Sequence, residues 1–167
     1  MPREGETVKA IVVDIDGTIA NTSERLMIAE ERVRRGKVNF FDAFLDSKLL
    51  HLDTPVPGSK ECIQDLAKDA QIIYLSGRRV DGTAETEKWL ALHGYPRGMV
   101  VLRRKGIATK PFKIEAIKSL KSQGYDVVCG IGNKEDDIEA YKEASVPGVL
   151  VETEVAWLDC PCKEKKS

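Results

Sequence analysis

Short runs of apolar and β-branched residues alternate along the chain with longer segments of helical periodicity. The run at residues 8–13 is continuously hydrophobic, which is typical of a strand buried on both faces of a parallel sheet. Similar runs occur at residues 71–75, 99–102, 126–131 and 146–151. Residues 59–70, 83–93 and 111–123 instead place apolar side chains on one helical face. This alternation predicts an α/β fold, a doubly wound, Rossmann-like, mostly parallel sheet flanked by helices.

Residues 19–56 interrupt the alternation. They separate the first predicted strand from the next predicted helix, and they contain an amphipathic run at residues 23–35 and an aromatic group, Phe40, Phe41 and Phe44. We expect these residues to form a small helical insert that folds over the sheet edge or acts as a small lid. The remaining chain predicts a single domain over residues 1–157 and a polar C-terminal tail over residues 158–167.

Composition narrows the class of protein. The chain has 167 residues, 42% of them apolar, and its 26 basic and 27 acidic side chains nearly balance. A chain of this length buries enough surface for one self-sufficient core, and the charge balance argues against general affinity for nucleic acids or membranes. No segment reaches the roughly 18 apolar residues of a membrane-spanning helix, and the first residues are too polar for a signal peptide. We therefore expect a cytoplasmic protein with no membrane insertion.

Four cysteines in an intracellular chain are expected to stay reduced. Cys62 and Cys129 lie in apolar stretches and are expected to be small buried side chains. Cys160 and Cys162 are one residue apart and so could hold a soft metal or form a redox pair. The residues beside them supply no further ligand for a tetrahedral site, and a solvated tail is the favoured interpretation.

Polar residues follow four of the predicted strands, at 14–18, 76–79, 103–105 and 132–137. In open α/β sheets, ligands bind beyond the carboxyl ends of the strands. Asp14 and Asp16 are the most informative pair, because neighbouring carboxylates after a buried strand repel each other unless a cation joins them. Mg²⁺ suits such oxygen ligands, and Asp136 and Asp137 could complete the set.

The charge along the chain fits a phosphate substrate next to a metal ion. Residues 76–113 contain nine basic and three acidic side chains, whereas residues 133–154 contain two basic and seven acidic ones. A basic wall beside an acidic corner can bind the oxygens of a metal-bridged phosphate from both sides.

These residues resemble the four motifs of the haloacid dehalogenase-like superfamily. The resemblance rests on Asp14-Ile15-Asp16-Gly17-Thr18 after a hydrophobic strand, Ser76 after a second strand, Lys113 near a helix start, and the acidic cluster after a later strand. It implies a Mg²⁺-dependent phosphatase without a full-size cap domain, since residues 19–56 have room only for a short helical flap.

The resemblance also implies roles for these residues. Asp14 resembles the nucleophile that becomes an aspartyl phosphate, and Asp16 resembles the acid and base that also offers its backbone carbonyl to Mg²⁺. Thr18, Ser76, Gly77 and Lys113 are expected to hold the phosphoryl oxygens.

The fourth motif has Asn133 where most members have aspartate. Residues 132–141 are similar to the corresponding element of lipin-type phosphatidate phosphatases, which implies that Asn133 coordinates the metal through its amide oxygen. Asp137, or else Asp136, then supplies the carboxylate.

Two arginines resemble those of the phosphatase module of polynucleotide end-repair enzymes. Arg25 lies eleven residues beyond Asp14, and Arg78 follows Ser76-Gly77; in that module such arginines contact the substrate. A small phosphomonoester or nucleotide is the favoured substrate, and a polynucleotide 3'-phosphatase is the alternative. A non-catalytic phosphate-binding regulatory module is the alternative from another class.

Overall fold

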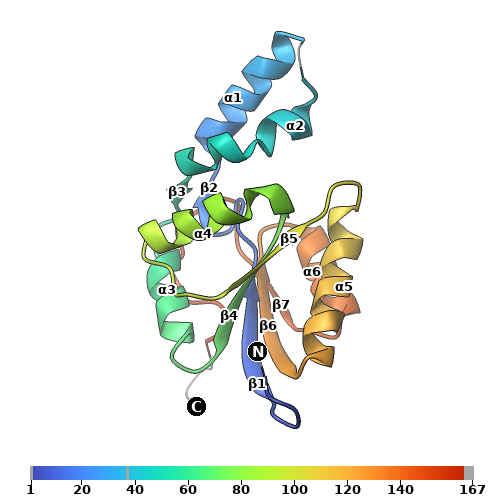
Figure 1. Cartoon of the computed structure of the whole chain (residues 1–167). Helices are drawn as coiled ribbons and strands as arrows, with labels where there is room; N and C mark the ends of the chain where they lie inside the picture. The colour runs from blue at the N-terminus through green and yellow to red at the C-terminus, as the bar shows by residue number, and fades with distance from the viewer. Residues whose placement is uncertain (1, 37, 164–167) are drawn as a thin grey trace.

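A computed structural model describes residues 2–36 and 38–163 of the chain (Figure 1). Its strands are β1 (Val8–Val13), β2 (Ala20–Asn21), β3 (Thr54–Pro55), β4 (Gln71–Arg79), β5 (Met99–Arg103), β6 (Tyr125–Gly132) and β7 (Gly148–Leu150). Its α-helices are α1 (Ser23–Arg34), α2 (Phe40–Phe44), α3 (Ser59–Leu66), α4 (Thr83–Leu92), α5 (Thr109–Ser122) and α6 (Glu135–Glu143). Two short 3-10 helices, η1 (Ser47–Leu52) and η2 (Val80–Gly82), complete the described elements.

Five strands form one parallel sheet in the order β5-β4-β1-β6-β7. The first strand, β1, is therefore central, and Val13 at its end is paired with Tyr74 on one side and Ile131 on the other. The predicted α/β fold is confirmed. Because all five strands run in the same direction, the loops that follow β1, β4, β5 and β6 meet at one edge of the sheet.

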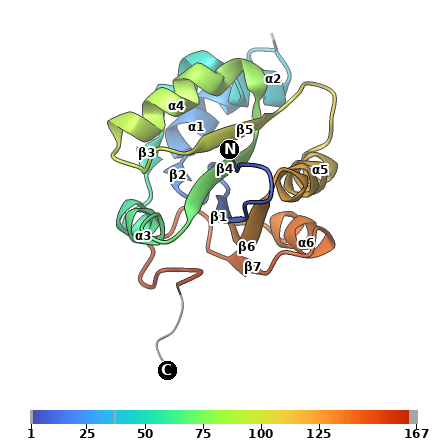
Figure 2. The same ribbon diagram turned by 60° about the horizontal axis from the view of Figure 1, so that its bottom comes forward.

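Alternate residues of β1 belong to two separate apolar cores. Ile11 and Val13 pack on one face with side chains of α3 and α4, whereas Ala10 and Val12 pack on the other face with side chains of α5 and α6. Figure 2 shows the two helix pairs on opposite sides of the sheet. The continuous hydrophobicity of the strand is thus explained by burial on both faces.

The insert stands beyond the carboxyl ends of the strands. Its base is the antiparallel pair of β2 and β3, in which Ala20 faces Pro55 and Asn21 faces Thr54. Helices α1 and α2 project from this base, away from the sheet (Figure 1). The insert is too small to be a full-size cap, as expected.

Helix α6 was not identified from the sequence. Only Asp137, Ala140 and Tyr141 of its nine residues are buried, so its apolar stripe is too short to produce a clear helical period. The charged residues at its start do satisfy a helix rule, since carboxylates near a helix N-terminus are favourable.

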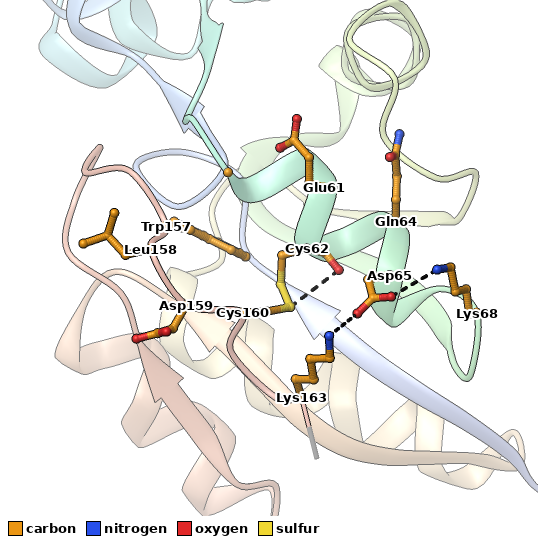
Figure 3. Close-up of a pocket in the computed structure, with 11 residues that line it drawn as sticks. Glu61, Cys62, Gln64, Asp65, Lys68, Trp157, Leu158, Asp159, Cys160 and Lys163 are labelled. Atoms are coloured by element: carbon orange, nitrogen blue, oxygen red, sulfur yellow. Dashed lines mark hydrogen bonds and ion pairs between the residues drawn. A yellow bond between two sulfur atoms is a disulfide. The ribbon is translucent and has the colours of Figure 1, made fainter. Parts of the chain in front are cut away.

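Cys62 and Cys129 are buried, as expected, but the prediction that the cysteines stay reduced is wrong. Cys160 forms a disulfide with Cys62 on α3, and Cys162 forms a second one with Cys129 on β6. The segment that precedes them is anchored to the domain, because the Trp157 side chain is buried and its main-chain nitrogen donates to Pro57 at 2.8 Å. Figure 3 shows Cys160 against α3 beside Trp157. Residues 158–163 are therefore not a free tail; residues 164–167 of the expected tail lie outside the described residues.

Within the part of the chain that the structure describes, none of the helices has the length and apolarity needed to cross a lipid bilayer.

Reduction of the disulfides is expected to lower the free energy of unfolding. They close loops with sequence separations of 98 and 33 residues, and a native disulfide typically contributes about 2–4 kcal/mol. Urea unfolding with and without dithiothreitol measures the difference. The variant carrying both Cys160→Ser and Cys162→Ser is the control, because its stability should not respond to the reductant in the same way. An unchanged unfolding midpoint of the parent on complete reduction would contradict the prediction.

Candidate active site

A small cavity of about 140 Å³ opens where the sheet meets the insert. Its walls come from the ends of β1, β4, β5 and β6, from the start of α5, and from α2. The lining residues are Asp14, Asp16, Phe41, Phe44, Leu45, Ser76, Gly77, Arg103, Thr109, Lys113, Lys134 and Asp137.

The loop after β1 turns tightly and places both aspartates at this cavity. Main-chain nitrogens of Thr18, Ile19 and Ala20 all donate to the Ile15 carbonyl, at 3.0–3.1 Å. Gly17 has φ +80°, and a Cβ there would collide with the Asn133 amide. Glycine is therefore required both for the backbone conformation and for the close approach of the two strand ends.

Lys113 joins two buried carboxylates of the cavity, Asp14 and Asp137. Its Nζ donates to Asp14 Oδ1 at 3.0 Å and to Asp137 Oδ1 at 2.7 Å, and its side chain is 2% exposed. Burial alone would lower the pKa of Lys113, but Asp14, Tyr141 and Asp137 outweigh it and hold the pKa above its ordinary value. Burial raises the pKa of Asp14 to about 6, against the opposing effect of Lys113 and with a smaller contribution from Asp137.

Three oxygen atoms converge beside Asp14. Asn133 Oδ1 lies 3.1 Å from both Asp14 Oδ2 and the main-chain oxygen of Asp16. The Thr18 hydroxyl lies within hydrogen-bond distance of Asn133 Oδ1 and of Asp14 Oδ2, at 3.1 Å from each. Turning the amide by 180° would make its nitrogen donate to these acceptors, which is the better arrangement without a cation. Carboxylate, carbonyl and amide oxygens are the ligands that Mg²⁺ prefers, so the donor set of Asp14, Asp16 and Asn133 fits this ion.

The other two expected metal ligands lie differently. Asp137 is buried at the first turn of α6, where it accepts from Lys113 and from the Lys134 main-chain nitrogen at 3.2 Å. Asp136 is exposed on the same turn and does not line the cavity. Among the described residues, no group of three or more His, Cys, Asp or Glu side chains is arranged to hold a metal. A cation here would depend on mixed carboxylate, amide and carbonyl oxygens.

The expected phosphate-binding residues are mostly brought together. Ser76, Gly77 and Lys113 line the cavity, and the Ser76 hydroxyl accepts from the Arg78 main-chain nitrogen at 3.1 Å. Thr18 is buried, and its hydroxyl is engaged by Asp14 and Asn133 rather than directed into the cavity. Its role in this structure is to fix those two side chains.

Asp16 forms a network of four charged side chains with Arg25, Asp53 and Arg78. Arg25 on α1 and Arg78 on β4 each donate to Asp16 Oδ1 at 2.7 Å and to Asp53 Oδ2 at 2.8 Å. Burial would raise the pKa of Asp16, but Arg78 and Arg25 outweigh it and lower the pKa to about 2. The network ties the insert to the core and orients the Asp16 side chain.

The structure does not place Arg25 and Arg78 where a substrate would contact them. Their exposures are 0% and 1%, and neither lines the cavity. Their remaining donors are also engaged, with the Phe44 carbonyl at 2.8 Å and the Thr86 hydroxyl at 3.1 Å. In this arrangement both arginines act on Asp16 instead.

Asp53 and the cavity residues Phe41, Phe44, Arg103 and Lys134 were missed as site residues. Asp53 follows η1 at the end of the insert, and no local motif distinguishes it from a turn residue. The aromatic group was recognised but not assigned to the site. Arg103 follows a predicted strand, and a cation at that position could have indicated a site residue.

Comparison with known proteins gives one family match. A family model described as HAD superfamily, subfamily IIIB (acid phosphatase), matches residues 1–157. No curated protein sequence matches the chain significantly.

Solved structures share the fold. A chain of the Pnkp1/Rnl/Hen1 RNA repair complex superposes with a TM-score of 0.70 at 16% identity, covering 92% of this chain and 45% of that one. A haloacid dehalogenase-like hydrolase from Streptococcus pneumoniae gives 0.66 at 11% identity, covering 92% and 89%. A class C acid phosphatase from Bacillus anthracis with tungstate bound gives 0.61 at 21% identity, covering 89% and 68%. The present chain thus spans less than half of the repair-complex chain.

Asp53→Asn is expected to destabilise the fold strongly. The change leaves two buried guanidinium groups with one carboxylate between them, and breaking a buried ion pair typically costs about 3–5 kcal/mol. Urea unfolding measures the loss, and Asp81→Asn at an exposed position is the matched control. A loss for Asp53→Asn no greater than that for Asp81→Asn would show that the network contributes little.

Proposed function

This chain belongs to the HAD superfamily, subfamily IIIB, a family of acid phosphatases, and from this premise we propose that it hydrolyses phosphomonoesters through an aspartyl phosphate on Asp14 with the help of Mg²⁺. The observation that carries the proposal is the convergence of Asp14, Asp16, Ser76 and Lys113 on one cavity at the carboxyl ends of the strands. As a phosphatase it is a phosphoric monoester hydrolase.

Asp14 is the proposed nucleophile. Its carboxylate attacks phosphorus, the bond between phosphorus and the ester oxygen breaks, and the phosphoryl group is left on Asp14. The departing alkoxide takes a proton from Asp16. Lys113, held against Asp14 at 3.0 Å, fixes the direction of the carboxylate and offers positive charge to the phosphoryl oxygens.

Water completes the reaction in the second step. It attacks the phosphoryl group, gives a proton to Asp16, and releases phosphate, so that Asp14 is regenerated. The Asp16 side chain is 21% exposed and lines the cavity. Its pKa of about 2 makes it a carboxylate at neutral pH, which suits the base of this step; the acid role in the first step requires substrate to loosen its contact with Arg25 and Arg78.

Mg²⁺ would be held by Asp14, the main-chain carbonyl of Asp16 and the Asn133 amide oxygen. When bound, it neutralises charge on the transferring phosphoryl group. Asp137 supports this site through its contact with Lys113. Asp136 is not included among the proposed metal ligands, because its side chain is exposed.

The substrate is proposed to be a small phosphomonoester or a nucleotide. The insert contributes Phe41, Phe44 and Leu45 to the cavity wall, but it is not a full-size cap, so the site selects little by size. Both aspartates of the first motif are present at the cavity, which supports catalysis over a phosphate-binding regulatory role.

A polynucleotide 3'-phosphatase is the second candidate. It is favoured by the fold shared with a chain of an RNA repair complex. Arg25 and Arg78, which the sequence resemblance assigns to substrate contact, are buried and bound to Asp16 and Asp53, so we place this candidate second.

A cytoplasmic location remains a prediction. Two disulfides in such a location require a source whose interior tolerates them, as in some heat-loving organisms.

Asp14→Asn is expected to abolish turnover of p-nitrophenyl phosphate in the presence of Mg²⁺, because an amide cannot form the acyl phosphate. Phosphate release is measured for parent and variant, and circular dichroism checks that both are folded. Asp16→Asn is expected to slow turnover by about 10²- to 10⁴-fold. Equal turnover by the parent and Asp14→Asn would exclude the proposed nucleophile.

Asp137→Asn is expected to raise the Mg²⁺ concentration that gives half-maximal activity, because Lys113 loses one of its two carboxylate partners. Asp136→Asn, the neighbouring exposed position, is the control and should behave like the parent. Titration of activity against Mg²⁺ compares the three proteins. A larger shift for Asp136→Asn would reverse the assignment.

A further inference from the structure

The cavity is too small to enclose a whole substrate. Its volume is about 140 Å³, whereas sites that enclose a drug-sized ligand measure roughly 300–1,000 Å³. The cavity can therefore take the phosphoryl group, and the leaving group of the substrate must lie at the rim. Residues of the rim then decide which leaving groups bind well.

Arg103 stands at this rim in a fixed position. Its Nε donates to the Gly77 carbonyl at 3.0 Å, and its NH1 group donates to the Ile107 carbonyl at 2.8 Å. Both acceptors are neutral, so Arg103 has no carboxylate partner among the described residues, and its NH2 group has no hydrogen bond there. A guanidinium held by two carbonyls has little conformational entropy left to lose when an anion binds.

A second guanidinium lies next to Arg103. Arg79 is its partner in the register between β4 and β5. Burial, and then the charge of Arg79, lower the pKa of Arg103, as expected for two adjacent cations. Arg79 pairs with Asp42 through NH1 at 2.7 Å, but its buried Nε has no hydrogen-bond partner.

Lys134 adds a further cation at the cavity, and none of the ion pairs found among the described residues includes it. Arg103 and Lys134 therefore have no carboxylate partner among the described residues, whereas Arg79 is paired with Asp42. Such an arrangement is unfavourable unless an anion joins the cations. In the proposed function, Lys113, Ser76 and Gly77 already bind the oxygens of the phosphoryl group.

We propose that Arg103, supported by Arg79, forms a second anion-binding subsite that selects phosphomonoesters whose leaving group carries another anionic group. This subsite deepens the proposed function and rests on it. Its ligand is a phosphate oxygen, either of a second phosphomonoester or of a phosphodiester. Arg103 is thus a specificity-determining residue in this proposal.

Three substrates test the subsite, each with a 3'-phosphate. Thymidine 3'-monophosphate has no second anion, thymidine 3',5'-bisphosphate has a second phosphomonoester, and the dinucleotide thymidylyl-thymidine 3'-phosphate has a phosphodiester. The parent is expected to show a kcat/KM at least about 10-fold higher for one of the two anionic substrates, which is the usual effect of a charge-assisted hydrogen bond. The substrate preferred identifies the source of the anion.

Arg103→Gln is expected to remove this preference while it changes kcat/KM for thymidine 3'-monophosphate by less than about 3-fold. Arg104→Gln, which alters the same charge at the neighbouring exposed position, is the matched control and should keep the preference. A preference that falls steeply as NaCl is raised gives an independent measure in the unmodified protein.

The proposal is overturned if Arg103→Gln slows all three substrates equally, if it slows none, or if the parent shows no preference. Turnover of p-nitrophenyl phosphate by the parent distinguishes failure of the subsite proposal from failure of the proposed function. If this turnover is present and the preference is absent, only the subsite is wrong; if the parent hydrolyses none of the four compounds, the proposed function is wrong as well.

Discussion

The site depends on one buried ammonium group. Lys113 lies between Asp14 and Asp137, at 3.0 and 2.7 Å, and all three side chains are largely hidden from solvent. Without this cation, two carboxylates so close together could not both stay ionised inside the protein. Lys113 therefore joins the loop after β1 to the start of α6, and it allows the carboxylate of Asp14, the proposed nucleophile, to line a small cavity.

The insert acts on the same loop from the other side. Through Arg25 and Asp53 it reaches Asp16, so the position of this side chain depends on residues from the insert and from β4 at once. An insert that is bound to the core by a buried ion network is well suited to form a fixed wall of the cavity. In the proposed function, selectivity then comes from the charges and aromatic rings at the rim, since no full-size cap encloses the leaving group.

The fold and the floor of the site could be predicted because both follow from local pattern. The run before Asp14 has to be a buried strand, and parallel strands bring Asp14, Ser76 and Asn133 to one edge whatever their separation in sequence. The disulfides and the burial of Arg25 depend on contacts between distant segments. Cys160 is bonded to Cys62 beside the buried Trp157, and Arg25 is buried against Asp53, 28 residues later in the chain. Arg103 is an intermediate case. Its position after a strand could be predicted from the sequence, but its contacts with Gly77 and Ile107 could not.

The most direct measurement is a crystal structure of the protein with Mg²⁺ and beryllium fluoride, which mimics a phosphoryl group on a carboxylate. We expect beryllium to be bonded to the Asp14 carboxylate, with the cation contacting Asp14, the Asp16 carbonyl and the Asn133 amide oxygen. Beryllium fluoride bonded to another residue, or a cation bound away from these oxygens in an otherwise intact fold, would contradict this expectation.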